Sequence, residues 1–209
     1  MLGQLYDKAL DGESCWVRHD DGQLRHLPVR SWLGGRHADS QFDTAVVNLC
    51  VGPTIDLGCG PGRLVADLVR RGIPALGVDQ SATAVGLARR IGAPVLRRDL
   101  FASLPGAGRW QTVLLADGNV GIGGEPRRVL RRASELLGRG GQCVVEFEKS
   151  ISGIRTGLVR LESSQSVGPW FQWASVGIDT ASRLADETGF TLAQVHSIGE
   201  RVVGVLAVR

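Results

Sequence analysis

The chain has 209 residues, a formal net charge of +3 and a pI near 8.9. Hydrophobic residues make up 43% of it and charged residues 22%, which is typical of soluble globular proteins and excludes a disulfide-dense miniprotein or a fully disordered chain. The longest strongly apolar run, Val202 to Val208, is far shorter than the roughly 20 residues of a membrane-spanning helix. Residues 1–14 contain no apolar stretch like that of a secretory signal. We therefore expect a single domain, 1–209, located in the cytoplasm and not attached to a membrane.

Neither the cysteines nor the histidines are spaced like the ligands of a metal. They are Cys15, Cys50, Cys59, Cys143, His19, His26, His37 and His196. No two cysteines have the C-x-x-C spacing of a zinc or redox site, and no cluster of histidines and carboxylates is apparent. We expect reduced thiols, as is usual in the cytoplasm, and no metal site.

The middle of the chain, residues 54–147, alternates strand-like apolar runs with helical patterns. This alternation is typical of βαβ units, which build a mostly parallel sheet with helices on both faces. The five expected strands are 54–57, 75–78, 94–96, 112–116 and 142–147. The expected helices begin after Gly62, at the N-cap Ser81 and near Pro126, and they end before Gly72, near Gly92 and at Leu137.

The two flanks are less regular. Residues 1–50 predict a short helix (2–10), a hairpin (14–29) and an amphipathic helix (41–49), which we interpret as an N-terminal cap over the sheet's edge. Residues 150–177 break the βαβ rhythm and are expected to form an insertion on the substrate side. A helix (179–189) and two strands (191–198 and 202–208) are expected to close the chain.

A cluster of glycines lies between the first strand and the first helix of the middle segment, in the sequence Asp56-Leu57-Gly58-Cys59-Gly60-Pro61-Gly62. Glycines there allow a sharp turn and a close approach to a ligand, and the helix that follows presents free N–H groups. The cluster departs from the dinucleotide fingerprint G-x-G-x-x-G, because Arg63 stands where the third glycine should be.

Acidic residues follow the next three strands. Asp79 comes 21 residues after Gly58, close to the spacing of about 20 expected of a carboxylate that binds ribose hydroxyls. Asp99 and Asp117 follow the third and fourth strands. Because the carboxyl ends of parallel strands meet at one edge, these side chains are expected to line a single crevice.

These residues together resemble a class I S-adenosylmethionine-dependent methyltransferase, whose first strand and loop read as an acidic residue followed by G-x-G-x-G. The run Asp-Gly-Asn-Val-Gly-Ile-Gly-Gly at 117–124 resembles small actinobacterial members in particular. The resemblance implies a doubly wound, Rossmann-like α/β fold with a mostly parallel seven-stranded sheet, strand order 3-2-1-4-5-7-6, an N-terminal cap and an insertion after strand five. It covers residues 54–147, the expected cofactor-binding core.

The resemblance also implies that the chain uses S-adenosylmethionine. The glycine loop would embrace the methionine part, Asp79 would hold the ribose, and Asp99 with Leu100 would frame the adenine. Residues 117–120 would line the path between methyl donor and acceptor. The residues assigned to the cofactor in this way are Asp56, Gly58, Cys59, Gly60, Gly62, Asp79, Gln80, Asp99, Leu100, Asp117, Gly118 and Asn119.

Methyl transfer from a sulfonium needs an aligned nucleophile, the exclusion of water and, for some acceptors, the removal of a proton. The candidate bases are Asp117, Glu146 at the end of the fifth strand, and His37 in the cap. Each has a structural alternative, since Asp117 could bind cofactor alone, Glu146 could pair with an arginine, and His37 could be a surface histidine.

The leading interpretation is metal-independent methyl transfer to a small molecule, with two alternatives. An RNA methyltransferase is suggested by a basic helix face formed by Arg127, Arg128, Arg131 and Arg132. The Asn/Asp-Pro-Pro-aromatic box of enzymes that methylate base amino groups is missing, however, and no aromatic residues are interleaved with these arginines. The other alternative is a cofactor-binding protein that regulates a partner without turnover. The aromatic residues of 170–173 could equally line an acceptor pocket or cover the sheet's flank.

Overall fold

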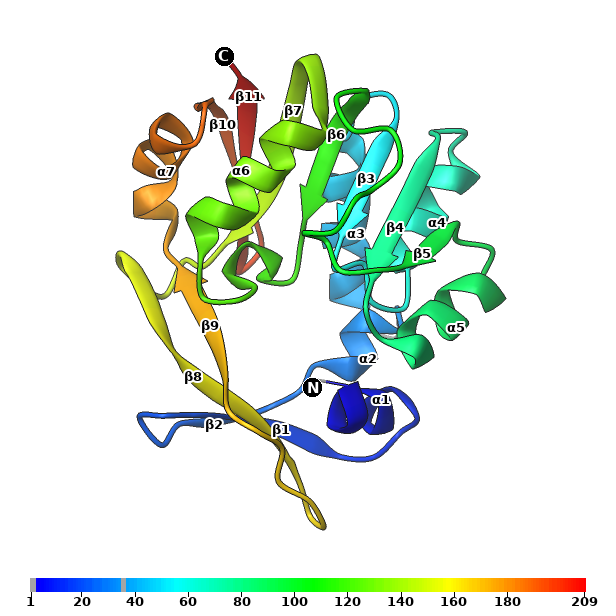
Figure 1. Cartoon of the computed structure of the whole chain (residues 1–209), viewed down its shortest axis with the longest axis vertical. Helices are drawn as coiled ribbons and strands as arrows, with labels where there is room; N and C mark the ends of the chain where they lie inside the picture. The colour runs from blue at the N-terminus through cyan, green and yellow to red at the C-terminus, as the bar shows by residue number, and fades with distance from the viewer. Residues whose placement is uncertain (1–2, 35–36) are drawn as a thin grey trace.

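The protein contains two β-sheets (Figure 1). The computed structural model describes residues 3–34 and 37–209, without the side chains of residues 37–39. The large sheet has seven strands, in the spatial order β10 (Phe190–Ile198), β11 (Arg201–Val208), β7 (Leu137–Phe147), β6 (Trp110–Leu115), β3 (Thr54–Leu57), β4 (Ala75–Asp79) and β5 (Val95–Arg97). Strands β3 to β7 are parallel, and β11 is antiparallel to β7 and β10. Numbered along the chain, this is the predicted order 3-2-1-4-5-7-6, and the predicted fold class is confirmed.

Helices cover both faces of the large sheet. The helices are α1 (Gly3–Leu10), α2 (Val29–Trp32), α3 (His37–Leu49), α4 (Arg63–Arg70), α5 (Ala82–Arg90), α6 (Pro126–Leu136) and α7 (Ala181–Glu187), with short 3-10 turns η1 (Asn119–Gly121) and η2 (Ile178–Thr180). On one face, Ile55 and Leu57 of β3 belong to the core cluster of α6 and α7. On the other, α3 and α4 pack against Leu114 and Val144. Burial on both faces explains the continuous apolar runs of the central strands.

Several helix ends are where the sequence places them. The Ser81 hydroxyl caps α5 by accepting a hydrogen bond from the Ala84 amide at 2.9 Å, and Pro126 occupies the first turn of α6. Among the described residues, no helix is both long and apolar enough to cross a membrane. All four cysteines are buried free thiols.

The small sheet joins two segments that lie far apart in the chain. Its strands, in spatial order, are β2 (Leu24–His26), β1 (Cys15–His19), β8 (Ile154–Ser163) and β9 (Phe171–Val176), all antiparallel. The predicted hairpin of residues 14–29 is therefore present, but it is completed by the segment expected to be an insertion. A hairpin alone is marginally stable in water, and the five residue pairs between β1 and β8 extend it to four strands.

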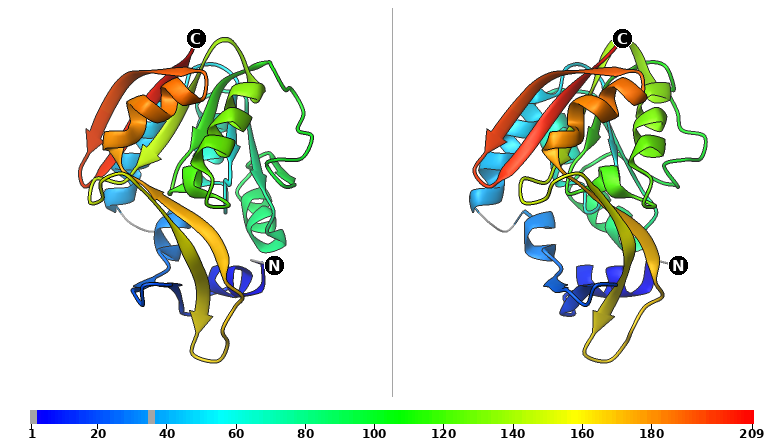
Figure 2. Two further views of the ribbon diagram at one scale, coloured as in Figure 1. Left: turned by 60° about the vertical axis from the view of Figure 1, so that its left-hand side comes forward. Right: turned by 90° about the vertical axis from the view of Figure 1, so that its left-hand side faces the viewer.

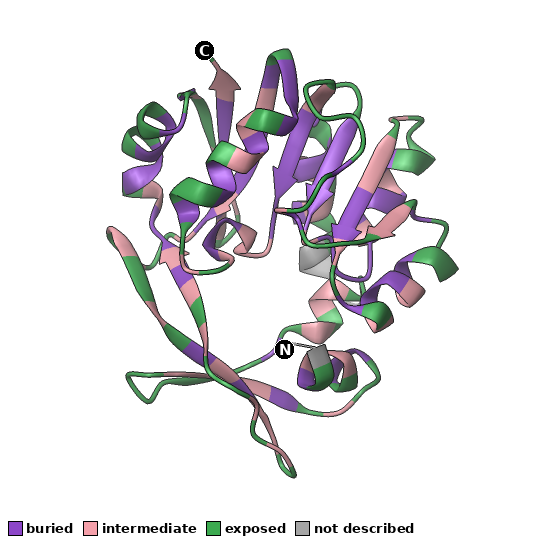
Figure 3. Cartoon of the chain, viewed as in Figure 1, coloured by how far each residue is buried: buried purple, intermediate pink, exposed green. Residues whose placement is uncertain are grey.

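The small sheet lies across the carboxyl ends of the parallel strands, together with α1 (Figures 1 and 2). Residues 1–50, which were expected to cap the sheet's edge, therefore lie in two places. Helix α3 covers one face of the large sheet, and α1, β1 and β2 lie beyond the ends of its parallel strands. The buried residues concentrate in the large sheet, while the small sheet mixes buried, intermediate and exposed positions (Figure 3). One end of the small sheet, at Ala174 and Val176 of β9, packs into the core of the large sheet, and the rest makes its apolar contacts with α1 and α2.

Close packing of η1 against β9 connects the two sheets. A Cβ built on Gly121 would lie 1.8 Å from the carbonyl oxygen of Ala174. The next residue, Ile122, forms an isolated antiparallel bridge with Trp173. A residue without a side chain is therefore required at position 121.

We expect Gly121→Ala to destabilise the protein by about 3 kcal/mol, because the overlapping backbone of β9 must shift. Gly86→Ala is the matched control, since its Cβ would meet only the flexible end of Arg90, at 3.8 Å in α5; it should stabilise by about 0.5–1 kcal/mol. Urea unfolding of both variants measures the difference. Equal stability of the two variants would contradict the proposed contact.

Candidate functional site

The glycine loop of residues 58–62 turns sharply at the carboxyl end of β3. Gly58, Gly60 and Gly62 have φ angles of 78°, 53° and 81°, which only glycine adopts without strain. The loop leads into α4, whose N-cap Gly62 provides no side-chain hydrogen bond to the first amides of the helix. Those amides form a donor surface of the kind that binds anionic or polar groups.

Asn119 braces the start of this loop. Its Nδ2 atom donates to the carbonyl oxygens of Leu57 and Gly58, at 3.0 and 2.8 Å. A Cβ on Gly58 would lie 2.7 Å from the same nitrogen. The motif of residues 117–124 and the glycine loop, which were recognised separately in the sequence, are therefore in direct contact.

Asp79 ties the end of β4 to the loop. Its carboxylate accepts hydrogen bonds from the amides of Gly60 and Ser81, at 2.9 and 2.8 Å. Burial raises the pKa of Asp79, and these two donors act in the opposite direction. The predicted ribose-binding carboxylate therefore adjoins the predicted methionine-binding loop.

Tyr6 of α1, the chain's only tyrosine, lies over the loop. Its hydroxyl is 3.1 Å from the position of a Cβ on Gly60. Burial, and then the negative charge of Asp79, raise the pKa of Tyr6, so the phenol stays protonated. The neighbouring Asp7 carboxylate accepts a hydrogen bond from the Ser81 hydroxyl, which holds α1 against the start of α5. Tyr6 is not among the site residues predicted from the sequence, because a single tyrosine in a short helix has no distinctive spacing.

Arg63 and Asp117 form the centre of a charged network. Arg63 donates to both carboxylate oxygens of Asp117, at 2.7 and 3.2 Å, and its Nε lies 2.9 Å from an oxygen of Asp43 in α3. The Arg63 side chain is only 9% exposed. The residue that interrupts the dinucleotide fingerprint thus joins α3 and α4 to the end of β6.

Arg201, at the start of β11, completes the network. It donates to Asp117 at 2.7 Å and to both oxygens of Glu146 at 2.6 Å. Its guanidinium also stacks 3.4 Å from the centre of the Phe42 ring. The amide of Asp117 donates to Glu146 at 2.6 Å. Five charged side chains, from α3, α4, β7, β11 and the turn after β6, therefore meet at one point.

The network determines the protonation of the two predicted bases that it contains. Burial opposes ionisation of Asp117, but Arg63 and Arg201 outweigh it and lower the pKa of Asp117. Burial raises the pKa of Glu146 against the attraction of Arg201. Both carboxylates are held by arginines, an arrangement that suits positioning better than proton removal. The third candidate, His37, is the first residue of α3, and its side chain lies outside the described part of the chain.

Comparison with known proteins identifies the architecture. No family model matches the sequence, and no curated protein is similar to it. A SAM-dependent methyltransferase from Bacteroides fragilis, solved with S-adenosyl-L-homocysteine, matches with a TM-score of 0.77 and 18% identity over 98% of this chain and 92% of its own. The 1,6-didemethyltoxoflavin-N1-methyltransferase of Burkholderia thailandensis matches with a TM-score of 0.60 and 17% identity, over 86% of this chain and 84% of its own. The CcbJ methyltransferase of Streptomyces caelestis matches with a TM-score of 0.64 and 18% identity, over 85% of this chain and 98% of its own. This chain has the methyltransferase fold.

The other residues predicted to bind the cofactor differ in how far they are exposed. Asp99 and Gln80 are exposed after β5 and β4, while Leu100 is buried. The Cys59 side chain points into the core, because a Cβ on Gly77 would lie 2.6 Å from its sulfur. Cys59 thus offers only its backbone to a ligand, and burial raises the pKa of its thiol. Gly118 has a φ of 80° directly after Asp117, whose own φ is 53°.

Asp56 is the most buried acidic residue of the site, at 2% exposure. Its side chain makes no hydrogen bond within the described ranges 3–34 and 37–209. Burial raises the pKa of Asp56 to about 8, in spite of the attraction of Arg63. The carboxyl group therefore binds a proton at neutral pH.

Removing Arg63 should be costly, because it leaves the partly buried carboxylate of Asp43 without a cation and that of Asp117 with Arg201 alone. We expect Arg63→Met to lower the free energy of unfolding by about 3 kcal/mol. Arg70→Met on the same helix, where the side chain is 67% exposed and pairs with Asp67, should cost less than about 1 kcal/mol. Urea unfolding measures both changes, and adding Asp43→Asn to Arg63→Met should recover part of the loss, because Asp43 is the carboxylate left without a cation. A cost for Arg63→Met no larger than that of the control would refute the network's contribution.

The raised pKa of Asp56 predicts a specific pH dependence. Between the unfolded pKa of about 4 and the folded value of about 8, the folded chain binds the extra proton, so the stability from this group is lost as the pH rises. Relative to the unaltered protein, Asp56→Asn should gain stability from pH 5 to 8, by up to about 1.4 kcal/mol per pH unit. Urea unfolding across this range, with the exposed Asp186→Asn as control, provides the test. A pH-independent difference would contradict the assignment.

Proposed function

We propose that this protein is an S-adenosylmethionine-dependent methyltransferase that acts on a small molecule. One observation carries the proposal: the Gly60 amide of the glycine loop donates a hydrogen bond to Asp79. This contact lies at the carboxyl end of a sheet that has the methyltransferase strand order. That edge is where ligands bind in open α/β sheets. Two similar structures were solved with bound S-adenosylhomocysteine, which supports this choice of cofactor.

The side chains present fit this cofactor. The loop of left-handed glycines and the uncapped start of α4 suit the amino-acid part, and Asp79 suits ribose hydroxyls. Asp99, exposed after β5, suits a donor on the adenine edge. The carboxylate of Asp79, which adjoins the loop, has the charge that complements a sulfonium cation.

When bound, S-adenosylmethionine supplies a methyl group that is already electrophilic, so the proposal requires no metal. The chain's own residues then hold the acceptor in line and exclude water. We assign the first task to the backbone of residues 117–121, which the arginine network fixes. We assign the second to α1, which places Tyr6 over the loop.

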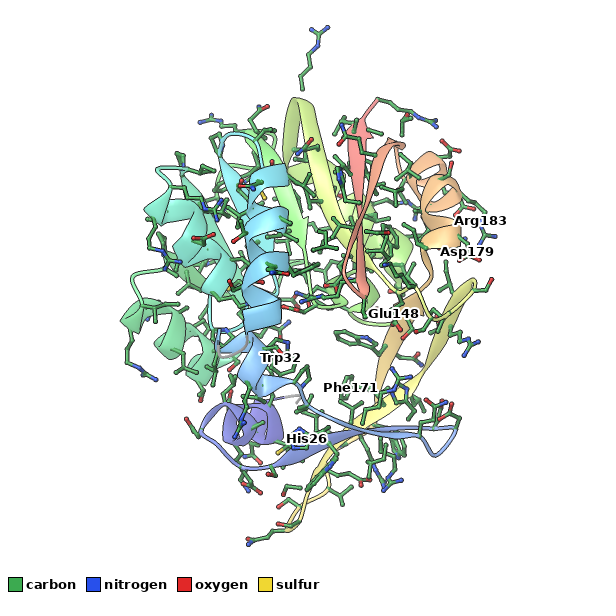
Figure 4. All side chains as sticks on the ribbon, turned by 180° about the vertical axis from the view of Figure 1, so that it is seen from behind. His26, Trp32, Glu148, Phe171, Asp179 and Arg183 are labelled. Carbon is green, nitrogen blue, oxygen red and sulfur yellow. The ribbon has the colours of Figure 1, made fainter. Side chains whose placement is uncertain are left out.

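A small acceptor is supported by the aromatic residues opposite the strand ends. Tyr6 and Trp32 pack edge to face with ring centres 5.7 Å apart, and Phe171 and Trp173 do so at 6.5 Å. Trp32 and Phe171 lie on the side of the small sheet that faces the large one (Figure 4). Such a lining suits an apolar or ring-bearing molecule. One of the similar structures is named for N-methylation of didemethyltoxoflavin.

The RNA alternative is less well supported. On the predicted basic face, Arg127 pairs with Glu187 at 2.5 Å, Arg128 pairs with Glu125 at 3.2 Å, and Arg132 pairs with Glu135 at 2.8 Å. These intramolecular partners reduce the charge available to phosphates.

The four buried free thiols agree with a reducing compartment such as the cytoplasm.

Binding of S-adenosylhomocysteine, measured by calorimetry, tests the site. Asp79→Ala should weaken binding by about 10- to 100-fold, the effect of losing hydrogen bonds to a charged group. Gly60→Val should abolish binding, because a side chain there meets the Tyr6 hydroxyl at a positive φ. Asp186→Ala, distant on α7, should bind normally. Unaltered affinity in both site variants would overturn the assignment.

Incubation with methyl-labelled cofactor then separates the functions. Label in a small-molecule fraction supports the proposal, and label in RNA supports the alternative. Tight cofactor binding without transfer to either fraction favours a regulatory protein that does not turn over.

A further inference from the structure

Two arginines of α6 hold the loop that follows β5. Arg132 donates from Nε to the carbonyl oxygen of Leu100 at 2.8 Å and from Nη2 to that of Ala102 at 2.6 Å. The Arg132 side chain is 14% exposed, whereas those of Arg127 and Arg128 on the same helix are 44% and 60% exposed. One turn earlier, Arg128 places its guanidinium 4.1 Å from the centre of the Phe101 ring. Three consecutive loop residues are therefore held from the same helix.

The loop itself is a tight turn built around Asp99. The Asp99 carboxylate accepts a hydrogen bond from the Phe101 amide at 2.9 Å. The main-chain carbonyl oxygen of Asp99 accepts one from the Ala102 amide at 3.0 Å. The Leu100 side chain is buried in the main core, and its amide donates to no atom of the described residues. Asp99 and the Leu100 amide thus offer an acceptor and a donor side by side on an exposed turn.

We propose that Arg132 is a positioning residue for recognition of the adenine ring, an inference that rests on the proposed function. An adenine edge presents an amino donor next to a ring-nitrogen acceptor, the complement of a carboxylate and an amide. Arg132 binds the carbonyl oxygens of Leu100 and Ala102, which fixes the peptide units that follow these two residues. The Leu100 amide belongs to the preceding peptide unit, whose carbonyl oxygen on Asp99 accepts from the Ala102 amide, so Arg132 acts on it through the turn. The orientation of the Leu100 amide relative to Asp99 then depends on a residue that does not touch the ligand.

This role also accounts for an arginine at position 132. A planar guanidinium with several donors in fixed directions can bind two carbonyl oxygens and Glu135 together, which the single ammonium of lysine matches poorly. Arg131, which is exposed on the same helix, makes no hydrogen bond to the loop and provides a matched control.

The test compares two ligands: S-adenosylhomocysteine and its inosine analogue, in which an oxo group replaces the adenine amino group and the ring nitrogen carries a proton. Calorimetry on the full chain should give the unaltered protein a preference of about tenfold or more for the adenine compound, as expected when the donor and acceptor are exchanged. Arg132→Met should lose most of this preference, with weaker binding of the adenine compound and little change for the analogue. Arg131→Met should retain it.

The outcomes distinguish positioning from general stability. If Arg132 only stabilises the fold, Arg132→Met weakens both ligands equally and the preference is unchanged, which overturns the inference. Arg132→Lys, which retains one donor group, should recover part of the preference and serves as the main variant if the methionine variant does not fold. If the unaltered protein binds S-adenosylhomocysteine without preferring it to the analogue, the inference fails alone. If it binds neither ligand, the proposed function fails as well.

Discussion

The buried guanidinium of Arg63 makes the contact on which the rest of the candidate site depends. It belongs to the first turn of α4 and binds Asp43 of α3 and Asp117 after β6. Asp117 has a left-handed backbone conformation, which costs a residue with a side chain about 1 kcal/mol or more. The arginines on its carboxylate, and Glu146 on its amide, offset that cost. The same contacts fix the turn that carries Asn119 to the glycine loop.

Pairing between distant parts of the chain builds the small sheet beyond the strand ends that carry this network. Neither the β1–β2 hairpin nor the β8–β9 hairpin would be stable alone, since two-stranded sheets are marginal in water. Paired with each other, they form a sheet whose inner face buries Leu5, Leu161 and Phe171 with α1. The contact between Gly121 and Ala174 then holds this sheet against the end of the large one. The proposed cofactor side and the proposed acceptor side are therefore built by different segments and meet at residues 117–122.

The mildly basic net charge is unevenly distributed. Acidic groups collect around the glycine loop, where Asp56, Asp79 and Asp117 all influence the ionisation of their neighbours. Many arginines, by contrast, act as structural donors to carboxylates, carbonyl oxygens and an aromatic ring. Three of the four arginines on the basic face of α6 pair with glutamates of the chain, so a basic face in the sequence is compatible with acidic groups at the candidate site.

Local patterns in the sequence determined the core of the fold. Strand β4, the Ser81 cap, the first turn of α6 and the glycine loop lie where the sequence places them, because hydrophobic period, capping and glycine content act over a few residues. The strand order came from the resemblance that these motifs carry. Tertiary structure alone decided that Arg63 and Arg201 would bind Asp117, across 54 and 84 residues, that Tyr6 would cover the loop, and that the two hairpins would pair. An arginine or a tyrosine looks the same in sequence whether it is solvated or buried, and its partner is set only when distant elements pack.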